Sequence, residues 1–411
     1  MIFLEARVRI CIVYDCLFPC TIGGAERWYA TLARRLVDEG HTVTYVTLRQ
    51  WDQGAPPDLG AVRVVAVGPR LALYKAERRR IWPPLRFGLG VFAHMLRHGR
   101  SYDAVHTASF PFFSLLALAL LRPFCGCRLV CDWHEVWSLA YWRAYLGPLG
   151  WVGWLVQWFC ARARHRAITF SALHQKRLSS LGGPSALIVR GQSEAGADHE
   201  PRSAATPPYA LYAGRLIPEK RVPLLIDALA IARRSAPDLR LMVIGDGPDL
   251  AQVKQRIEAH GLGAHVDLPG FVSAAELEDA MGRALCLVQP SSREGYGKVV
   301  VEACARGVPV LVVPAPDNAA TELIEQGRNG FVADAPTPDA LAAAMLACHR
   351  AGPALRESTG AWHRENKGLL SLDHWLPSII DFYGEVQDEL CVFDGWWLEG
   401  LVAAITAGLY L

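Results

Sequence analysis

The chain has 411 residues, of which 52% are hydrophobic and 20% charged, a composition that fits an α/β protein of two or three domains with buried parallel strands. The net charge is only +2, but it is unevenly distributed. Residues 1–190 carry 24 Lys or Arg against 11 Asp or Glu, and the remainder carries 18 against 29. A basic first half attracts anionic partners such as acidic lipid headgroups, pyrophosphates or nucleic acid, or it helps the two halves to dock.

The eleven cysteines exclude the common metal and redox motifs. Neither Cys16-x3-Cys20 nor Cys125-x-Cys127-x3-Cys131 has the spacing of a zinc or redox site, so we expect a reducing compartment. Charged residues at positions 5, 7 and 9 interrupt the apolar amino terminus, and we therefore expect no signal peptide. These features predict a cytoplasmic protein.

The amino-terminal part predicts a strand, a glycine turn and a helix. Residues 6–14 predict a strand, Gly23 and Gly24 follow in a turn, and a helix is expected to end at Asp38. Such a unit directs backbone N–H groups toward an anion at the carboxyl edge of a parallel sheet. An ordinary strand-to-helix turn would explain the same pattern. The absence of G-x-G-x-x-G after this strand argues against a nicotinamide or flavin enzyme.

Further short apolar runs predict the other strands of the first domain. The segment at 128–131 ends in Asp-Trp-His-Glu, in which His134 is a candidate because ligands bind beyond the carboxyl ends of parallel strands. A purely structural histidine is the alternative. Residues 110–121 are too short to span a bilayer and predict a core helix. The other expected strands cover residues 42–48, 61–67, 104–107, 167–170 and 186–189.

Residues 144–161 form an aromatic segment without formal charge, followed by three arginines at 162, 164 and 166. Its length is borderline for a membrane span, but glycines and a proline break its first half. An aromatic helix with a basic end suits a membrane interface, and a helix packed on the sheet is the alternative.

Residues 191–208 are polar and rich in Ala, Ser and Pro, which predicts a linker. A second domain then starts with a strand at 209–213 and a turn that contains Gly214, Arg215 and Lys220. The planar fork of Arg and the point charge of Lys both suit a diphosphate.

The rest of this domain is predicted to repeat strands, turns and helices. A loop containing Val272 follows one of these strands. The tail at 389–411 contains an uncharged run of twelve residues, too short to span a membrane, and stays unassigned. The expected elements are strands at 240–244, 266–268, 284–289, 310–313 and 330–332 and helices at 222–233, 338–349 and 372–386.

Residues 290–307 carry the most informative motif. A strand is followed by a glycine-containing turn and a helix at 298–306, which would present backbone N–H groups to an anion. Glu294 and Glu302 bracket this anion site. Because a carboxylate repels a phosphate, each should accept hydrogen bonds from neutral hydroxyls, one from a ribose and one from a hexose, with a diphosphate between them. The alternative is a turn glutamate and a solvated helix glutamate.

Glu294-x7-Glu302 with an intervening Gly-Tyr-Gly, together with the Gly-Arg…Glu-Lys turn at 214–220, resembles the signature of retaining glycosyltransferases of family 4 (group 1). The resemblance covers roughly residues 7–388 and implies the GT-B fold, an α/β architecture of two Rossmann-like domains that face each other across a cleft. It implies an acceptor-side domain at 1–190, a nucleotide-sugar domain at 209–370 and a closing helix at 371–388 that returns to the first domain.

The resemblance also implies roles for individual residues. Glu302 would hold the ribose and Glu294 the donor sugar beside the anomeric carbon. Arg215 and Lys220 would neutralise the departing diphosphate, and His134 would lie near the donor sugar and the acceptor. We expect these side chains to converge on one site. The expected donor-binding residues are Gly23, Gly24, Gly214, Val272, Gly295, Tyr296, Gly297, Lys298 and Glu302.

The implied activity is transfer of a hexose, with retention, from a UDP- or GDP-sugar to a glycan or lipid-linked acceptor. No metal, cofactor or nucleic-acid partner is expected, because Arg215 and Lys220 lie where other such enzymes place a divalent ion. The basic, tryptophan-rich first half predicts peripheral attachment to an anionic inner membrane face. The alternatives are a GT-B sugar-nucleotide epimerase and a non-catalytic sugar-nucleotide-binding membrane scaffold.

Overall fold

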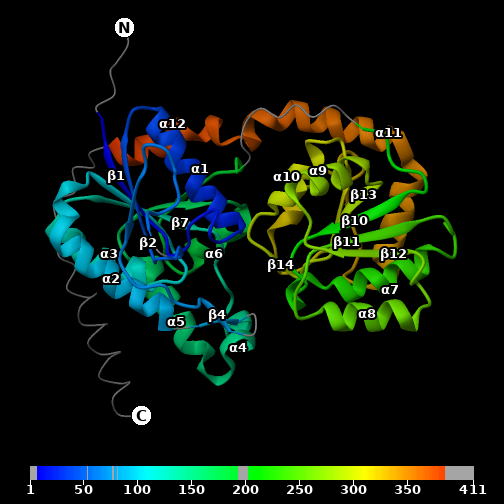
Figure 1. The fold of residues 1–411 in the computed structure, drawn as a ribbon, viewed down its shortest axis with the longest axis horizontal. Helices are drawn as coiled ribbons and strands as arrows, with labels where there is room; N and C mark the ends of the chain where they lie inside the picture. Colours follow the sequence, from blue (N-terminus) through cyan, green and yellow to red (C-terminus); the bar gives the residue numbers. More distant parts are fainter. Residues whose placement is uncertain (1–6, 53, 76–77, 81, 193–201, 385–411) are drawn as a thin grey trace, which may run out of the picture.

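The computed structural model describes residues 7–384 except 53, 76–77, 81 and 193–201. The unassigned tail, the end of the predicted closing helix and part of the linker therefore lie outside the described residues. The described chain forms two lobes, each built around a parallel sheet (Figure 1).

The first lobe contains a seven-stranded parallel sheet in the order β3-β2-β1-β6-β7-β8-β9. Its central strands are almost entirely buried, as the apolar runs predict. The strand order reverses between β1 and β6, so loops diverge there and leave a crevice at the carboxyl edge. The strands are β1 (Arg9–Val13), β2 (Thr42–Thr47), β3 (Arg63–Ala66), β6 (Ala104–Ala108), β7 (Arg128–Trp133), β8 (Arg166–Thr169) and β9 (Ala186–Ile188).

The helices of this lobe connect the parallel strands. Helix α1 ends at the predicted residue, whereas α3 begins and ends a few residues later than expected. A short hairpin of β4 (Tyr74–Lys75) and β5 (Arg78–Arg79) precedes α2. The helices are α1 (Gly24–Asp38), α2 (Trp82–His98), η1 (Gly99–Ser101), α3 (Phe113–Cys125) and α6 (Ala172–Ser180).

The aromatic segment at 144–161 is not one helix. It is divided between α4 (Leu139–Leu146) and α5 (Gly150–Arg162) by the turn η2 (Gly147–Leu149). The glycines let the two helices pack closely, because a Cβ on Gly153 would lie 2.3 Å from the Trp142 ring. Among the described residues, no helix is long and apolar enough to cross a membrane.

The second lobe contains a six-stranded parallel sheet in the order β12-β11-β10-β13-β15-β17. Its order reverses between β10 and β13, which gives a second crevice at a carboxyl edge. The predicted strands are present, and β12 extends two residues further than expected. The strands are β10 (Tyr209–Ala213), β11 (Arg240–Ile244), β12 (Val266–Gly270), β13 (Cys286–Gln289), β15 (Val310–Val312) and β17 (Gly330–Val332).

Short helices and a small additional pairing complete the second lobe. Strand β14 (Arg293–Glu294) pairs in parallel with β16 (Asp317–Asn318), outside the main sheet. The helices are η3 (Pro218–Lys220), α7 (Val222–Ala232), α8 (Leu250–Ala259), α9 (Ala274–Arg283), α10 (Lys298–Cys304) and η4 (Ala319–Leu323).

The last two helices connect the lobes (Figure 1). Helix α11 (Pro338–Leu370) covers the second lobe and kinks at Gly352, whose φ is +54°. Helix α12 (Leu372–Gly384) lies against the first lobe, where Asp373 forms an ion pair of 2.6 Å with Arg35. The predicted architecture, two Rossmann-like α/β domains, is confirmed.

Candidate active site

The two sheet reversals bring the predicted loops together. In the second sheet β10 and β13 are neighbours, so the turn at 214–220 lies beside the loop at 290–297. The two loops are hydrogen-bonded, because the Ser292 N–H donates to the Glu219 carbonyl at 2.7 Å. In the first sheet, β7 lies next to β6 and delivers His134 just beyond its last residue.

Glu294 and Lys220 form an ion pair at this edge of the second sheet. The Gln289 amide donates to the same carboxylate oxygen, Oε1, at 2.6 Å. Burial alone would raise the pKa of Glu294, but the charge and hydrogen bond of Lys220, with a further bond from Gln289, hold that pKa below its ordinary value. The carboxylate is therefore ionised and acts only as a hydrogen-bond acceptor.

The backbone around Glu294 is held in place by Asn318. The buried Asn318 amide donates to the carbonyl of Ser291 at 3.2 Å and to that of Val313 at 2.9 Å. Gly297, the N-cap that precedes α10, has a φ of +102°, a conformation that favours glycine, and a Cβ there would lie 2.8 Å from Ala320. The loop therefore has little freedom to move Glu294.

Gly295 brings this loop against the first domain. A Cβ on Gly295 would lie 2.5 Å from the His134 carbonyl oxygen and 3.0 Å from Cγ of Glu135. Only a residue without a side chain allows this approach. The structure thus places Glu294 and His134, which come from different domains, on adjoining loops.

The His134 ring is enclosed by aromatic side chains. It stacks on Phe170 with ring centroids 4.6 Å apart and meets the Tyr29 ring edge-on at 5.8 Å. Burial lowers the pKa of His134, and the charges of Asp132 and Glu135 only partly offset this effect. The imidazole is therefore neutral, and its buried Nε2 has no hydrogen-bond partner among the described residues.

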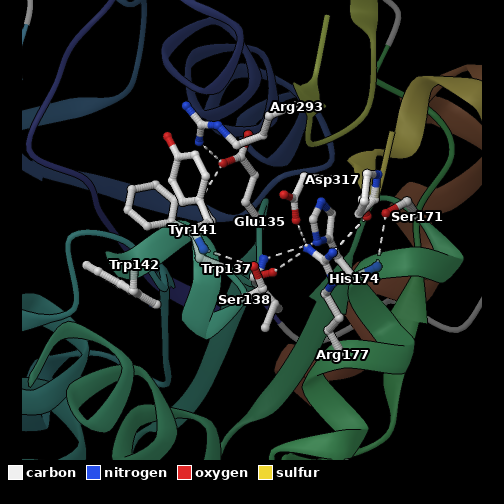
Figure 2. Close-up of polar contacts among 12 residues, drawn as sticks. Glu135, Trp137, Ser138, Tyr141, Trp142, Ser171, His174, Arg177, Arg293 and Asp317 are labelled. Atoms are coloured by element: carbon white, nitrogen blue, oxygen red, sulfur yellow. Dashed lines mark hydrogen bonds and ion pairs between the residues drawn. The ribbon is translucent and has the colours of Figure 1, made fainter. Parts of the chain in front are cut away.

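Arg293 links the two domains beside this site (Figure 2). It forms an ion pair with Glu135, and its guanidinium lies 4.6 Å from the Tyr141 ring centroid and 5.2 Å from that of Trp137. The Tyr141 hydroxyl in turn donates to Glu219 of the second domain at 3.0 Å. These contacts combine charge attraction with cation–π attraction across the domain boundary.

Helix α6 provides a second connection between the domains. Both carboxylate oxygens of Glu322 accept hydrogen bonds at 2.8 Å from N–H groups in its first turn, those of Ala172 and Leu173. Arg177 forms an ion pair of 2.6 Å with Asp317, as Figure 2 shows. A carboxylate at the start of a helix is favoured by the free N–H groups and the helix dipole.

A cavity of about 350 Å³ opens between α1 of the first domain and α10 of the second. Glu302 and Lys298 line its second-domain side, and Arg27 and Arg34 line the opposite side. Glu302 therefore faces the gap between the domains. The remaining lining residues are Phe18, Ala30, Thr31, Ala274, Tyr296 and Val301.

The predicted side chains do not all converge on one point. Among the described residues, the Glu302 carboxylate forms no ion pair with Arg215 or Lys220, and it lies instead on the cavity beside α1. Arg215 is exposed, and its carbonyl accepts a hydrogen bond from Tyr212 at 2.8 Å. Lys220 is directed at Glu294, and these two side chains form an ion pair directly.

For Gly23 and Tyr296, two further residues expected to bind the donor, the structure shows which groups lie next to them. A Cβ on Gly23 would lie 2.2 Å from Oε2 of Glu26, so a carboxylate already occupies the space next to the glycine turn. The Tyr296 hydroxyl donates to the carbonyl of Arg190 in the first domain. The Tyr296 side chain therefore connects the domains.

The other expected donor-binding residues lie next to the ends of strands or at the start of a helix. Gly214, with a φ of +158°, is exposed directly after β10, and its carbonyl closely approaches Gly245. Gly24 begins α1 and is exposed. Val272 lies between β12 and the Ser273 cap of α9 and is half-buried.

Sequence reasoning missed Arg293, Glu135 and the residues that they contact. Both lie directly next to predicted residues, Glu294 and His134, and that proximity was the available signal. Among the described residues, no group of three or more His, Cys, Asp or Glu side chains is arranged to hold a metal ion.

Two family models match consecutive parts of the chain. The model described as Glycosyltransferase Family 4 matches residues 22–191, and the model described as Glycosyl transferases group 1 matches residues 197–357. The first match covers the strands of the first sheet except β1, and the second match covers the strands of the second sheet. Residues 192–196 lie between the two matches.

Curated relatives align over shorter segments. An uncharacterized glycosyltransferase of Methanocaldococcus jannaschii is 28% identical over 44% of this chain and 49% of its own length. A GDP-mannose-dependent alpha-(1-6)-phosphatidylinositol monomannoside mannosyltransferase of Mycolicibacterium smegmatis is 31% identical over 39% of this chain and 44% of its own. The chain thus spans about half the length of the curated relatives it matches.

Solved structures match over nearly the whole chain at low sequence identity. Sucrose-phosphate synthase from Thermosynechococcus elongatus superposes with a TM-score of 0.73 at 18% identity, covering 92% of this chain and 98% of that one. HepE from Anabaena in complex with UDP gives a TM-score of 0.70 at 18% identity, covering 92% and 100%. On the family models and the shared architecture, the chain belongs to the group 1 glycosyltransferases of family 4 and has the GT-B fold.

Proposed function

We propose that this protein transfers a hexose from a nucleoside-diphosphate sugar to an acceptor, with retention of configuration and without a metal ion or cofactor. The observation that carries the proposal is the Glu294–Lys220 pair at the reversal of the second sheet, on a loop whose Gly295 packs against the backbone of His134. An ionised acid and a cation therefore lie at a boundary between two domains, on a loop that adjoins the one carrying the neutral imidazole.

The departure of a diphosphate requires positive charge close to the departing oxygen, and Lys220 would provide it. As the bond between the anomeric carbon and the diphosphate breaks, negative charge grows on the departing oxygen. Lys220, Arg215 and the backbone amides of residues 295–298 would stabilise that charge, and each such donor contributes about 3 kcal/mol. Glu294 would at the same time accept hydrogen bonds from hexose hydroxyls, and Glu302 from the ribose.

The acceptor oxygen would attack from the face that the diphosphate leaves. Glu294 is engaged by Lys220 and Gln289, which favours a binding role over that of a covalent nucleophile. The departing phosphate oxygen would take the acceptor proton. Neutral His134 would orient the sugar and support an oxocarbenium-like transition state through its unpartnered Nε2.

A donor screen tests this function. Thermal unfolding is followed with UDP, GDP and their hexose conjugates, and the conjugate that stabilises the protein is then incubated with and without glycan or lipid-linked acceptors. Release of nucleoside diphosphate that depends on acceptor supports the transferase. Conversion of the donor sugar without any acceptor would instead indicate an epimerase, and binding without turnover a non-catalytic subunit.

The acceptor is proposed to be lipid-linked and reached from an anionic membrane surface. Leu149, Trp151 and Val152, where η2 joins α5, are 63%, 51% and 38% exposed, and Arg143 is exposed nearby on α4. Exposed apolar side chains beside a cation suit the interface of an anionic bilayer. The Mycolicibacterium relative is named for a phosphatidylinositol-linked acceptor.

Co-sedimentation with vesicles tests the membrane proposal. At low salt the protein is expected to bind vesicles that contain anionic lipid, and Trp151→Ala is expected to weaken this binding. Leu369→Ala removes a side chain that is also exposed, at 45%, but lies on α11, so it serves as the control. Failure of the unaltered protein to bind anionic vesicles would contradict the proposal.

A further inference from the structure

A chain of buried polar groups lies beneath His134. Oδ2 of Asp132, on β7, accepts a hydrogen bond from the Trp28 indole at 2.7 Å, and Oδ1 lies 2.7 Å from Nε2 of His106. Nδ1 of His106 lies 2.5 Å from the hydroxyl of Tyr383, on α12. All four side chains are at most 1% exposed. The chain thus joins α1, two central strands and the helix that returns from the second domain.

The donor and the acceptor of each hydrogen bond in this chain can be assigned. The ionised Asp132 carboxylate only accepts hydrogen bonds, so Nε2 of His106 carries the hydrogen that faces it. In the neutral imidazole Nδ1 then accepts from the hydroxyl of Tyr383, which keeps its proton because burial raises its pKa far above the ordinary value. Burial would raise the pKa of Asp132, but the hydrogen bonds with His106 and Trp28 outweigh that effect and keep this pKa lowered.

The rings that enclose His134 are packed on members of this chain. Phe170, which stacks on His134, also meets the Trp28 ring edge-on at 5.1 Å. Tyr29, which contacts His134 edge-on, also meets the His106 ring edge-on at 6.0 Å. Each of these two rings therefore packs against a residue that is hydrogen-bonded to Asp132. A buried polar chain with all partners present restricts such packing to one arrangement.

We infer that Tyr383, His106 and Asp132 are positioning residues that fix the orientation of the His134 ring, and that they make it depend on the docking of α12. The inference rests on the proposed role of His134 at the donor sugar. Removal of the Tyr383 hydroxyl deprives His106 of its donor, which frees the imidazole to change its tautomer or rotate. Asp132 then loses a fixed partner, and the rings around His134 lose their support.

Steady-state kinetics of Tyr383→Phe test the inference, because this change keeps the ring and removes only the hydroxyl. We expect kcat to fall about tenfold, with the KM for the donor within about twofold, since a small misplacement of a positioned group mainly slows the chemical step. In a His134→Ala background the same change should have no further effect. Equal losses in both backgrounds would overturn the inference.

The matched control is Tyr209→Phe, which removes a hydroxyl that donates to the carbonyl of Ala280 at 2.6 Å in the second domain. It should leave kcat unchanged. If Tyr209→Phe lowers kcat as much as Tyr383→Phe does, the effect is one of general stability and the inference fails.

A readout that needs no substrate separates this inference from the proposed function. Histidine side-chain NMR of the free protein should show His106 protonated at Nε2, and Tyr383→Phe should change the signals of both His106 and His134. Changed signals in a protein that transfers no sugar would support the positioning chain and refute the proposed function. Unchanged His134 signals in an active transferase would refute the positioning chain alone.

Discussion

Replacement of Gly295 by alanine tests whether the two domains must meet at His134. The added Cβ would lie 2.5 Å from the His134 carbonyl oxygen, whereas carbon and oxygen normally approach no closer than about 3.3 Å. The loop cannot easily retreat, because Asn318 and Gly297 hold it on the other side. The domains must therefore separate by about 1 Å at this contact.

The expected consequence is a large loss of activity with little loss of stability. Overpacking of this kind costs about 1–3 kcal/mol, and at a domain boundary separation of the domains relieves it without unfolding either one. A misplacement of about 1 Å between reacting groups lowers the rate about 100-fold. Gly295→Ala should therefore lower kcat about 100-fold, while the temperature of unfolding changes little.

The assay is acceptor-dependent release of nucleoside diphosphate, with thermal unfolding measured in parallel. Gly263→Ala is the control, because its Cβ would meet no atom within 4 Å. Both glycines have a backbone that alanine can adopt, since neither has a positive φ. If Gly295→Ala keeps kcat within about twofold, the contact with His134 is not part of the catalytic conformation.

Three further predictions follow from the contacts at the site. Lys220→Ala leaves the largely buried Glu294 without its ion partner and should destabilise the protein by up to about 3 kcal/mol in urea unfolding. Because the pKa of Glu294 is lowered in the folded protein, the ion pair stabilises the protein fully above the unfolded pKa of about 4.3. The difference in the free energy of unfolding between Lys220→Ala and the unaltered protein should therefore shrink as pH falls below that value. A difference that stays constant with pH would contradict this assignment. Arg293→Ala removes the ion pair with Glu135 and should lower activity about tenfold, because a small misplacement of the two domains slows the chemical step, and it should speed proteolysis between the domains. The control Arg283→Ala breaks an exposed ion pair with Asp279 and should have neither effect. A chelator should leave activity unchanged; loss that magnesium restores would refute the proposed metal independence.

Much of the fold could be predicted because buried parallel strands are short, apolar and bounded by turns. Helix α11 shows the limit of this approach. The pattern at 338–349 predicted only its first part, whereas the helix kinks at Gly352, next to Pro353, and continues to Leu370. The glycines at 150 and 153 predicted a break, and they also provide the close packing of α4 on α5.

The site was predictable where the chemistry is local in the sequence. Glu294 follows its strand by a few residues, and Lys220 lies in a turn after a neighbouring strand. The pairing of Arg293 with Glu135 was not predictable, because it depends on how two domains dock. The Asp132 chain was also missed, since one partner, His106, lies inside an apolar strand and another, Tyr383, lies on the last helix.

The most direct test of the central claim is turnover by Glu294→Gln, measured with donor affinity by calorimetry on the same preparation. Glutamine keeps the shape of the side chain and removes the charge that Lys220 holds at the edge of the second sheet. We predict that the dissociation constant of the nucleoside diphosphate stays within about twofold and that acceptor-dependent turnover falls at least about 100-fold. Turnover equal to that of the unaltered protein would contradict the assignment of this site.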